Sequence, residues 1–295
     1  MNFDNPAWKR APVRTGVRVF ASLARRMVPQ LSRVAVSYDG GRSRVYADLG
    51  TPMGLHLYRY GHRDPDVELV GRLLGPGDLF VDGGANVGLF TLVAAERVGE
   101  TGKVVAFEPG RLVRLRLLEN VVLNRFEQVV VMPFALASES GEASFREFDV
   151  AGAGLNHLAP AADEEGHIDT VSLTTLDATL TPRDLARLRL VKLDLEGAEY
   201  AALLGASRVL RDARPDILIE IEPAHLQRMG STADAVVALL RERDYRLYKP
   251  GSDDAGQVML RPVADVTALG AGGPNVFATV DVGRARRRGV RITDS

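Results

Sequence analysis

The most constraining feature of the sequence is a glycine-rich stretch that follows a short apolar run. The run ends at Asp82, and the chain then passes through Gly83, Gly84 and Gly88 before apolar residues return at helical spacing. A strand, a glycine-rich turn and the start of a helix form an arrangement that holds an anionic or nucleotide-like ligand on free backbone N–H groups. Glycine adopts backbone angles closed to other residues, and Gly88 lets the helix lie close to the strand. We therefore expect a ligand-binding loop here.

Composition limits the remaining possibilities. With 295 residues, 46% hydrophobic and 25% charged, the chain resembles a soluble globular protein with one large α/β domain or two small ones. A net charge of −1 argues against a nucleic-acid binder, and the lack of cysteine excludes disulfides, thiolate metal sites and cysteine nucleophiles. No apolar run is long enough to span a membrane, and arginines interrupt the N-terminal region, so we expect no signal peptide and a cytoplasmic protein.

Strands and helices alternate through the middle of the chain. Near-continuous apolar strands separated by helical patterns indicate a parallel sheet covered on both faces. Beyond the first strand at 79–83, strands are expected at 103–107, 129–134, 188–193, 216–221 and 245–248. An alternating segment at 275–280 predicts an antiparallel strand at the edge of this sheet.

The domain organisation follows from breaks in this rhythm. The segment 13–28 reads as a basic amphipathic helix, either a membrane-surface or lid helix or one packed on the domain with a solvated basic face. Alternation around Asp39-Gly40-Gly41 predicts a hairpin. The expected parts are an N-terminal extension over 1–65, a main domain over 66–281 with an insertion at 137–176, and a basic tail over 282–295.

Acidic residues follow most of the predicted parallel strands. Asp82, Glu108, Asp194 with Glu196, and Glu220 with Glu222 all lie where such a strand ends. The carboxyl ends of parallel strands meet at one edge of the sheet, where ligands bind. Any one of these acids alone could be a solvated strand end or a helix cap. Together they would repel one another unless cations, hydroxyl groups or helix N-termini compensated their negative charges.

The ligand class is indicated by Glu108. It lies about twenty residues past the glycines, where an acid is expected to bind a ribose diol, so a bound nucleoside is favoured. The pattern from Gly83 through Ala85 to Gly88 also fits a loose dinucleotide fingerprint. Against NAD, an acid directly before the glycines would face a pyrophosphate unfavourably and would suit a positively charged ligand. An NAD-type oxidoreductase and a non-catalytic nucleoside-binding module remain alternatives.

Several segments together resemble a known family. They are VDGGANVG at 81–88, VAFEP at 105–109, Asn120 with Asn124, TLD at 175–177 and VKLDLEGAE at 191–199. In order and spacing, from about residue 61 to 221, they resemble the FkbM family of S-adenosylmethionine-dependent methyltransferases, and Asn275-Val276 resembles the closing strand of that family. The KLDLEGAE block is the most specific part of the match.

The resemblance implies a Rossmann-like class I methyltransferase fold, with a seven-stranded, mostly parallel sheet whose last strand is antiparallel. It implies S-adenosylmethionine as cofactor and a hydroxyl of a sugar, a glycan or a polyketide-type natural product as acceptor. Glu108 would contact the ribose. The other implied cofactor residues are Asp82, Gly83, Gly84, Ala85, Asn86 and Gly88 at the methionine end, and Ala135 and Leu136 beside the adenine.

Methyl transfer to an alcohol near neutral pH requires a base or a metal ion that lowers the pKa of the alcohol. Asp194, Glu196 and His225 are the candidate bases. Alternatively, Asp194 and Glu222 could hold one divalent ion such as Mg²⁺ through oxygen ligands. His157 either reaches the acceptor if its loop closes as a lid or is a solvated loop histidine. The sequence leaves the acceptor and the oligomeric state open.

Overall fold

The computed structural model describes residues 33–60, 64–147, 156–158, 167–253, 255–264 and 275–293. The chain divides into two compact units, Met1–His62 and Arg63–Ser295. The helix expected over 13–28 lies outside the described residues. No described helix combines the length and the apolar character that a membrane crossing requires.

The described part of the first unit is a hairpin followed by a helix. Strands β1 (Arg33–Tyr38) and β2 (Ser43–Asp48) pair antiparallel through the 3-10 turn η3 (Asp39–Gly41), as the sequence predicts. Asp39, Gly40 and Gly41 all have positive φ, which suits the Asp-Gly-Gly sequence. Helix α2 (Pro52–Tyr60) follows.

The second unit is built on a nine-stranded sheet in the order β15-β13-β12-β14-β11-β10-β3-β4-β5. Neighbours from β11 to β5 are parallel, and β14 is antiparallel to both β11 and β12. The strands are β3 (Leu79–Gly83), β4 (Lys103–Phe107), β5 (Val129–Met132), β10 (Leu188–Leu193), β11 (Asp216–Glu220), β12 (Arg246–Ser252), β13 (Val258–Pro262), β14 (Asn275–Thr279) and β15 (Arg291–Ile292).

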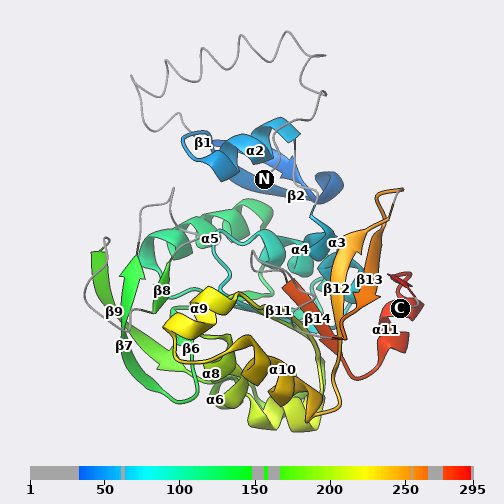
Figure 1. Ribbon diagram of the computed structural model, residues 1–295. Coiled ribbons are helices and arrows are strands. Elements are labelled where there is room, and N and C mark those ends of the chain that lie inside the picture. The colour runs from blue at the N-terminus through cyan, green and yellow to red at the C-terminus, as the bar shows by residue number, and fades with distance from the viewer. Residues whose placement is uncertain are drawn as a thin grey trace. The chain divides into compact units, whose positions relative to one another are not determined.

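Helices cover both faces of this sheet (Figure 1). One face packs on α3 (Pro65–Leu73), α4 (Leu89–Val98) and α5 (Arg111–Asn124). The opposite face packs on α6 (Leu176–Thr179), α8 (Glu199–Leu204), the π-helix η5 (Val209–Ala213) and α10 (Ala233–Arg241). Side chains alternate between the two cores along each strand, as in Leu79 and Val81 against Phe80. Short helices α7 (Pro182–Leu185) and α9 (Pro223–Arg228) complete the helical elements of these layers.

Strand β14 corrects one expectation about the sheet. It lies between β11 and β12 and is not an edge strand, although its antiparallel direction is as predicted. Val276, Phe277 and Ala278 are fully buried, because the strand has neighbours on both sides and a core on each face. Alternation in the sequence does not reveal where a strand lies in the sheet order.

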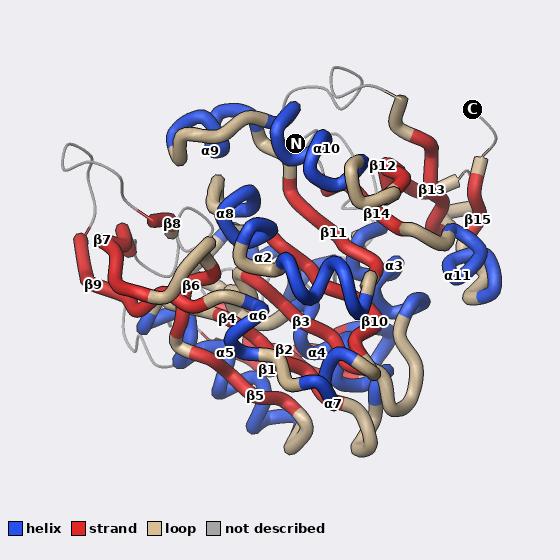
Figure 2. The backbone as a smooth tube through the Cα atoms, turned by 90° about the horizontal axis from the view of Figure 1, so that it is seen from below, coloured by secondary structure: helices blue, strands red, loops and turns tan. Residues whose placement is uncertain are grey.

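A separate four-stranded sheet lies beside the main one, in the order β6-β9-β7-β8 (Figure 2). Its strands are β6 (Phe134–Leu136), β7 (Gly141–Glu147), β8 (His157–Leu158) and β9 (His167–Thr174). Strands β7, β8 and β9 come from the segment that the sequence marks as an insertion.

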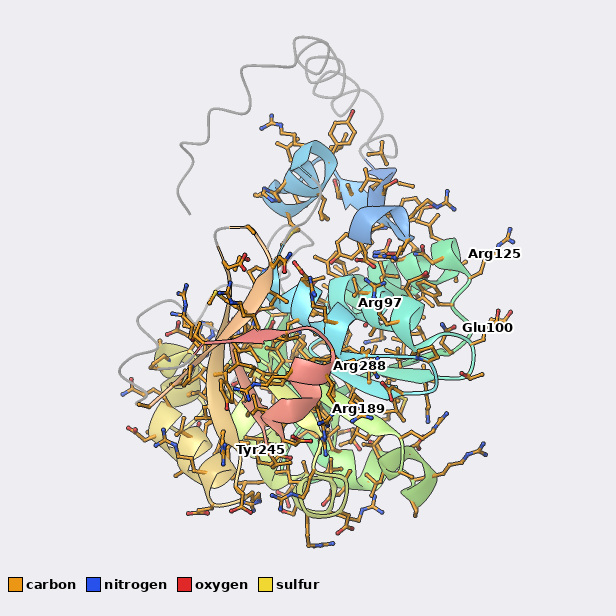
Figure 3. All side chains as sticks on the ribbon, turned by 90° about the vertical axis from the view of Figure 1, so that its right-hand side faces the viewer. Arg97, Glu100, Arg125, Arg189, Tyr245 and Arg288 are labelled. Atoms are coloured by element: carbon orange, nitrogen blue, oxygen red, sulfur yellow. The ribbon has the colours of Figure 1, made fainter. Side chains whose placement is uncertain are left out.

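The C-terminal residues are folded where the structure describes them, which corrects the expected basic tail. Helix α11 (Val282–Arg287) follows β14, and β15 pairs parallel with β13. Arg288 lies 3.6 Å from Asp78 Oδ2, and Arg189 lies 3.7 Å from Asp78 Oδ1; both arginines are labelled in Figure 3. Acids at the amino ends of β3 and β11 thus meet arginines of this segment, since Arg284 also lies 3.8 Å from Asp216.

Candidate active site

The glycine-rich loop, residues 83–88, joins β3 to α4 and makes its hydrogen bonds within the protein. The N–H groups of Gly84 and Ala85 donate to Phe107 O at 3.1 and 3.0 Å. The Asn86 N–H donates to the Glu108 carboxylate, and the Val87 N–H donates to Asn86 Oδ1. The loop is therefore not a cradle of free N–H groups, which corrects the first expectation. A pyrophosphate would find those donors occupied, and this argues against the NAD alternative.

Close packing explains the residue types of this loop. A Cβ on Gly84, whose φ is +70°, would lie 1.9 Å from Asp194 O, so β3 and β10 approach as closely as only glycine permits. A Cβ on Gly88 would lie 2.5 Å from Leu117 on α5. Asn86 has a φ of 51°, which asparagine tolerates better than most residues. Asn120 Nδ2 donates to Val87 O at 2.8 Å and ties the loop to α5.

Glu108 follows β4 and is fixed by backbone donors. Its Oε2 accepts from Asn86 N at 2.8 Å and its Oε1 from Gly110 N at 2.9 Å, so the carboxylate bridges two loops at the sheet edge. Burial raises its pKa to about 7, against the opposing effect of these two N–H donors. The carboxylate lies where a ribose diol would be bound if the loop holds a nucleoside.

Asp82 is completely buried and joined to Lys192, which is 2% exposed. Asp82 Oδ2 accepts from Thr91 Oγ1 at 2.6 Å, and Lys192 Nζ lies 3.6 Å from its Oδ1. The same ammonium lies 3.3 Å from Asp194 Oδ2 and donates to Gly84 O at 2.9 Å. Burial raises the pKa of Asp82, and Lys192 and Thr91 oppose that shift. Contact between Asp82 and the cofactor stays a prediction.

The loop after β10 is held by Glu199. Its Oε1 accepts from Leu195 N at 2.6 Å and from Gly197 N at 3.3 Å. Glu196 has a φ of 54°, a strained conformation for this residue type. Its carbonyl accepts from Arg228 Nη2 at 2.9 Å. These contacts fix the direction in which the Glu196 side chain leaves the loop.

A second group of side chains, here called the rim cluster, consists of Glu196, Glu220 and His225. They come from the loop after β10, the end of β11 and helix α9. His225 Nδ1 lies 3.0 Å from Glu196 Oε2 and 3.8 Å from Glu220 Oε2. Burial and nearby carboxylates raise the pKa of Glu196 to about 7 and that of Glu220 to about 9, whereas burial lowers the pKa of His225. Carboxyl groups are thus crowded at this end of the edge.

Four other predicted residues lie elsewhere. Glu222 caps α9, accepting from Ala224 N at 3.2 Å, so its carboxylate has a structural use that the sequence-based metal pair with Asp194 did not foresee. His157 is 6% exposed in β8 and is not a solvated loop histidine. Ala135 and Leu136 are buried in β6, and Leu136 packs beside Gly83. Contact of these two with adenine stays a prediction.

Three residues of the site were not assigned a role from the sequence. Lys192 is a lysine inside the otherwise apolar second half of β10, which is a signal for a buried charged partner. In the sequence, Glu199 stands out only as part of the family motif, and Glu220 only as one of two neighbouring strand-end acids. The structure shows that Glu220, and not Glu222, faces Glu196 and His225.

The order β5-β4-β3-β10-β11-β14-β12, with only β14 antiparallel, is that of a class I S-adenosylmethionine-dependent methyltransferase. The loop after the first strand and the acid after the second occupy the positions expected of that class. A family model described as the methyltransferase FkbM domain matches residues 82–247, more than half of the chain. The chain therefore belongs to the FkbM methyltransferase family.

Individual relatives are more distant. The chain is 28% identical over 216 residues to the AMB antimetabolite synthetase AmbE of Pseudomonas aeruginosa, which covers 60% of this chain and only 10% of AmbE. A methyltransferase FkbM from Methylobacillus flagellatus KT is 19% identical with a TM-score of 0.41, covering 69% of this chain and 43% of that one. A methyltransferase from Streptococcus mutans in complex with SAH is 9% identical with a TM-score of 0.42, covering 72% and 94%.

Proposed function

We propose that this chain transfers the methyl group of S-adenosylmethionine to a hydroxyl oxygen of a sugar, a glycan or a polyketide-type natural product. The observation that carries the proposal is the division of the sheet edge into two chemical halves. Glu108, fixed by two backbone N–H groups, can bind a nucleoside at the ends of β3 and β4. The rim cluster, at the ends of β10 and β11, offers carboxylates and an imidazole that can accept a proton.

The residues of the first half suit this cofactor. A ribose offers hydroxyl donors to the Glu108 carboxylate. S-adenosylmethionine carries no phosphate, so it does not need the N–H groups of the 83–88 loop, which are already hydrogen-bonded. We propose that Asp82, Gly83, Gly84, Ala85, Asn86 and Gly88 position the methionine end, and that Ala135 and Leu136 border the adenine.

The second half would remove the acceptor's proton. The cofactor supplies a methyl group on a positively charged sulfur, and charge is lost as the methyl moves to oxygen, so the protein's tasks are alignment and proton removal. Asp194, Glu196 and His225 are the candidate proton acceptors. The lowered pKa of His225 keeps its imidazole neutral near pH 7, the form that can take a proton.

The chemistry of the rim cluster and one relative favour a hydroxyl acceptor. A cluster of proton-accepting groups is useful for a hydroxyl, which must lose its proton, and is less needed for a neutral amine that attacks through its lone pair. AmbE is named an antimetabolite synthetase, which favours a natural-product acceptor. We propose a small-molecule or glycan acceptor and no nucleic-acid partner; the cytoplasmic location stays a prediction.

The test is transfer of a labelled methyl group from S-adenosylmethionine to glycan and natural-product fractions, with the product bond identified by mass spectrometry. The proposal predicts an O-methyl ether, and loss of product in the Asp194→Ala variant. Labelling of nitrogen or carbon would contradict it. Binding of a nicotinamide cofactor in place of S-adenosylmethionine would support the oxidoreductase alternative. Cofactor binding without transfer to any acceptor, with Asp194→Ala binding the cofactor as the wild type does, would support the non-catalytic module.

A further inference from the structure

The rim cluster has the geometry of a metal site. Among the described residues, Glu196, Glu220 and His225 form the group whose ligand atoms all lie within 4.8 Å of one another. The three come from three different elements of the fold, so their convergence is set by tertiary structure and not by sequence spacing. Their side chains are 18%, 20% and 27% exposed, which leaves the cluster reachable from solvent.

Two buried atoms of this cluster lie close together without a hydrogen bond between them. Glu220 Oε2 and His225 Nδ1 are buried, and neither makes a hydrogen bond of normal geometry within the described residues, although His225 Nδ1 lies 3.0 Å from Glu196 Oε2. Buried polar atoms in folded proteins are nearly always bonded, so unbonded ones call for an explanation, of which a bound ion or water is one. These two atoms lie 3.8 Å apart.

The cationic side chains near the cluster are paired with other groups. Lys192 is paired with Asp82 and Asp194, and Arg228 donates to the Glu196 carbonyl. Asp194 and Glu199 add further negative charge around Glu196 and Glu220. An added cation is therefore the partner that this cluster lacks.

We propose that Glu196, Glu220 and His225 bind one divalent transition-metal ion beside the methyl-transfer site. Two carboxylates and one imidazole are a ligand set for Mn²⁺, Fe²⁺, Co²⁺ or Zn²⁺, because the nitrogen ligand disfavours Mg²⁺ and Ca²⁺. Three protein ligands leave coordination positions open for an acceptor oxygen. The ligand set differs from the pair Asp194 and Glu222 expected from the sequence.

The role of the ion rests on the proposed function. An acceptor hydroxyl bound at an open position would have a lower pKa, which would ease loss of its proton to Asp194. Binding of the ion itself does not depend on that role, so the two proposals can fail separately.

The experiment is calorimetric titration of chelator-treated full-length protein with Mn²⁺, and absorption spectroscopy with Co²⁺, which reports a nitrogen ligand. Wild type is expected to bind one ion. His225→Ala or Glu220→Gln should weaken binding by more than the roughly 10–100-fold that loss of an outer-shell partner costs. Glu119→Gln on α5 is the matched control and should bind as wild type, since Glu119 pairs with Arg116 away from the cluster.

Titration of each variant with S-adenosylhomocysteine checks folding and separates the outcomes. Cofactor binding without binding of Mn²⁺, Zn²⁺ or Co²⁺ at millimolar concentration would overturn the metal site and leave Glu196 and His225 as base candidates. Ion binding that is unchanged in His225→Ala would also overturn it. If the wild type does not bind S-adenosylhomocysteine, the proposed function is contradicted, whatever the metal result.

Discussion

The strand-end edge has two halves, the cofactor half at the ends of β3 and β4 and the acceptor half at the ends of β10 and β11. They differ in which groups offset the charges of their acids. In the cofactor half, each oxygen of Glu108 accepts from a backbone N–H, and Asp82 accepts from Thr91 and lies 3.6 Å from the Lys192 ammonium, although its Oδ1 has no hydrogen bond within the described residues. In the acceptor half, Glu196, Glu220 and His225 converge with buried atoms that make no hydrogen bond of normal geometry within the described residues. The acids of the first half are therefore countered by N–H donors and an ammonium of the protein, whereas the carboxyl groups of the rim cluster lie beside an imidazole.

Lys192 links the two halves, and its removal should have the largest effect. Lys192→Met leaves Asp82 buried without its ammonium partner, and breaking a buried pair in this way costs about 3–5 kcal/mol. The free energy of unfolding in urea measures the loss. The double variant Asp82→Asn/Lys192→Met should recover much of it, and a double variant as unstable as Lys192→Met would show that Asp82 is not the source of the cost.

Gly84 tests how closely the halves pack, with Gly99 as its matched control. Both have positive φ, but a Cβ on Gly99 has nothing within 4 Å. Gly99 lies at φ 63° and ψ −174°, a region essentially restricted to glycine, so Gly99→Ala should lose about 1–3 kcal/mol from backbone conformation alone. Gly84→Ala should lose about 1–3 kcal/mol more because its Cβ would lie 1.9 Å from Asp194 O, and should weaken binding of S-adenosylhomocysteine. Equal losses in urea unfolding for the two variants would contradict the close approach.

The crowded carboxyls predict the pH dependence of stability. Burial raises the pKa of Glu108, Glu196 and Glu199 from 4.5 to about 7 in the folded chain. The folded state therefore binds more protons than the unfolded state between these values, so stability is present below about pH 4.5 and is lost as pH rises. Each carboxyl contributes a slope of at most about 1.4 kcal/mol per pH unit.

Urea unfolding of the metal-free protein at several pH values between 5 and 8 measures this slope. We expect the free energy of unfolding to fall across the range. A free energy that rises with pH there would show that these carboxyls are better compensated in the fold than their burial indicates.

Glu222 should show the smallest effect. Glu222→Ala removes the cap of α9 at a cost of about 0.5–1 kcal/mol, measured by urea unfolding. Binding of Mn²⁺ should not change. A large loss of ion affinity would show that Glu222 is a metal ligand, as the sequence predicts, and would contradict the ligand set proposed for the rim cluster.

The local pattern of the sequence predicted much of the fold, because the information lies within single segments. The alternation of apolar strands and helices gave the parallel sheet, and the run from Asp82 to Gly88 gave the loop and its glycines. The place of Glu108 at the end of β4 was predicted because its distance from the glycines along the chain reflects one strand–helix–strand unit, and its contact with a ribose stays a prediction. The family resemblance, carried by the same segments, is confirmed by the family match.

The features that the sequence did not predict depend on contacts between distant segments. The place of β14 inside the sheet is set by pairing with β11 and β12. The choice between Glu220 and Glu222 depends on where β11 ends and α9 begins, since the residue after the turn caps the helix. The N–H groups of the loop looked free in sequence because their acceptors, Phe107 O and Glu108, lie on the next strand unit.

The most direct measurement is a crystal structure of the protein with S-adenosylhomocysteine. Our account predicts the ribose hydroxyls on the Glu108 carboxylate, with the sulfur turned toward Asp194 and the rim cluster. A nucleoside bound away from Glu108 and the 83–88 loop would contradict the division of this edge into a cofactor half and an acceptor half.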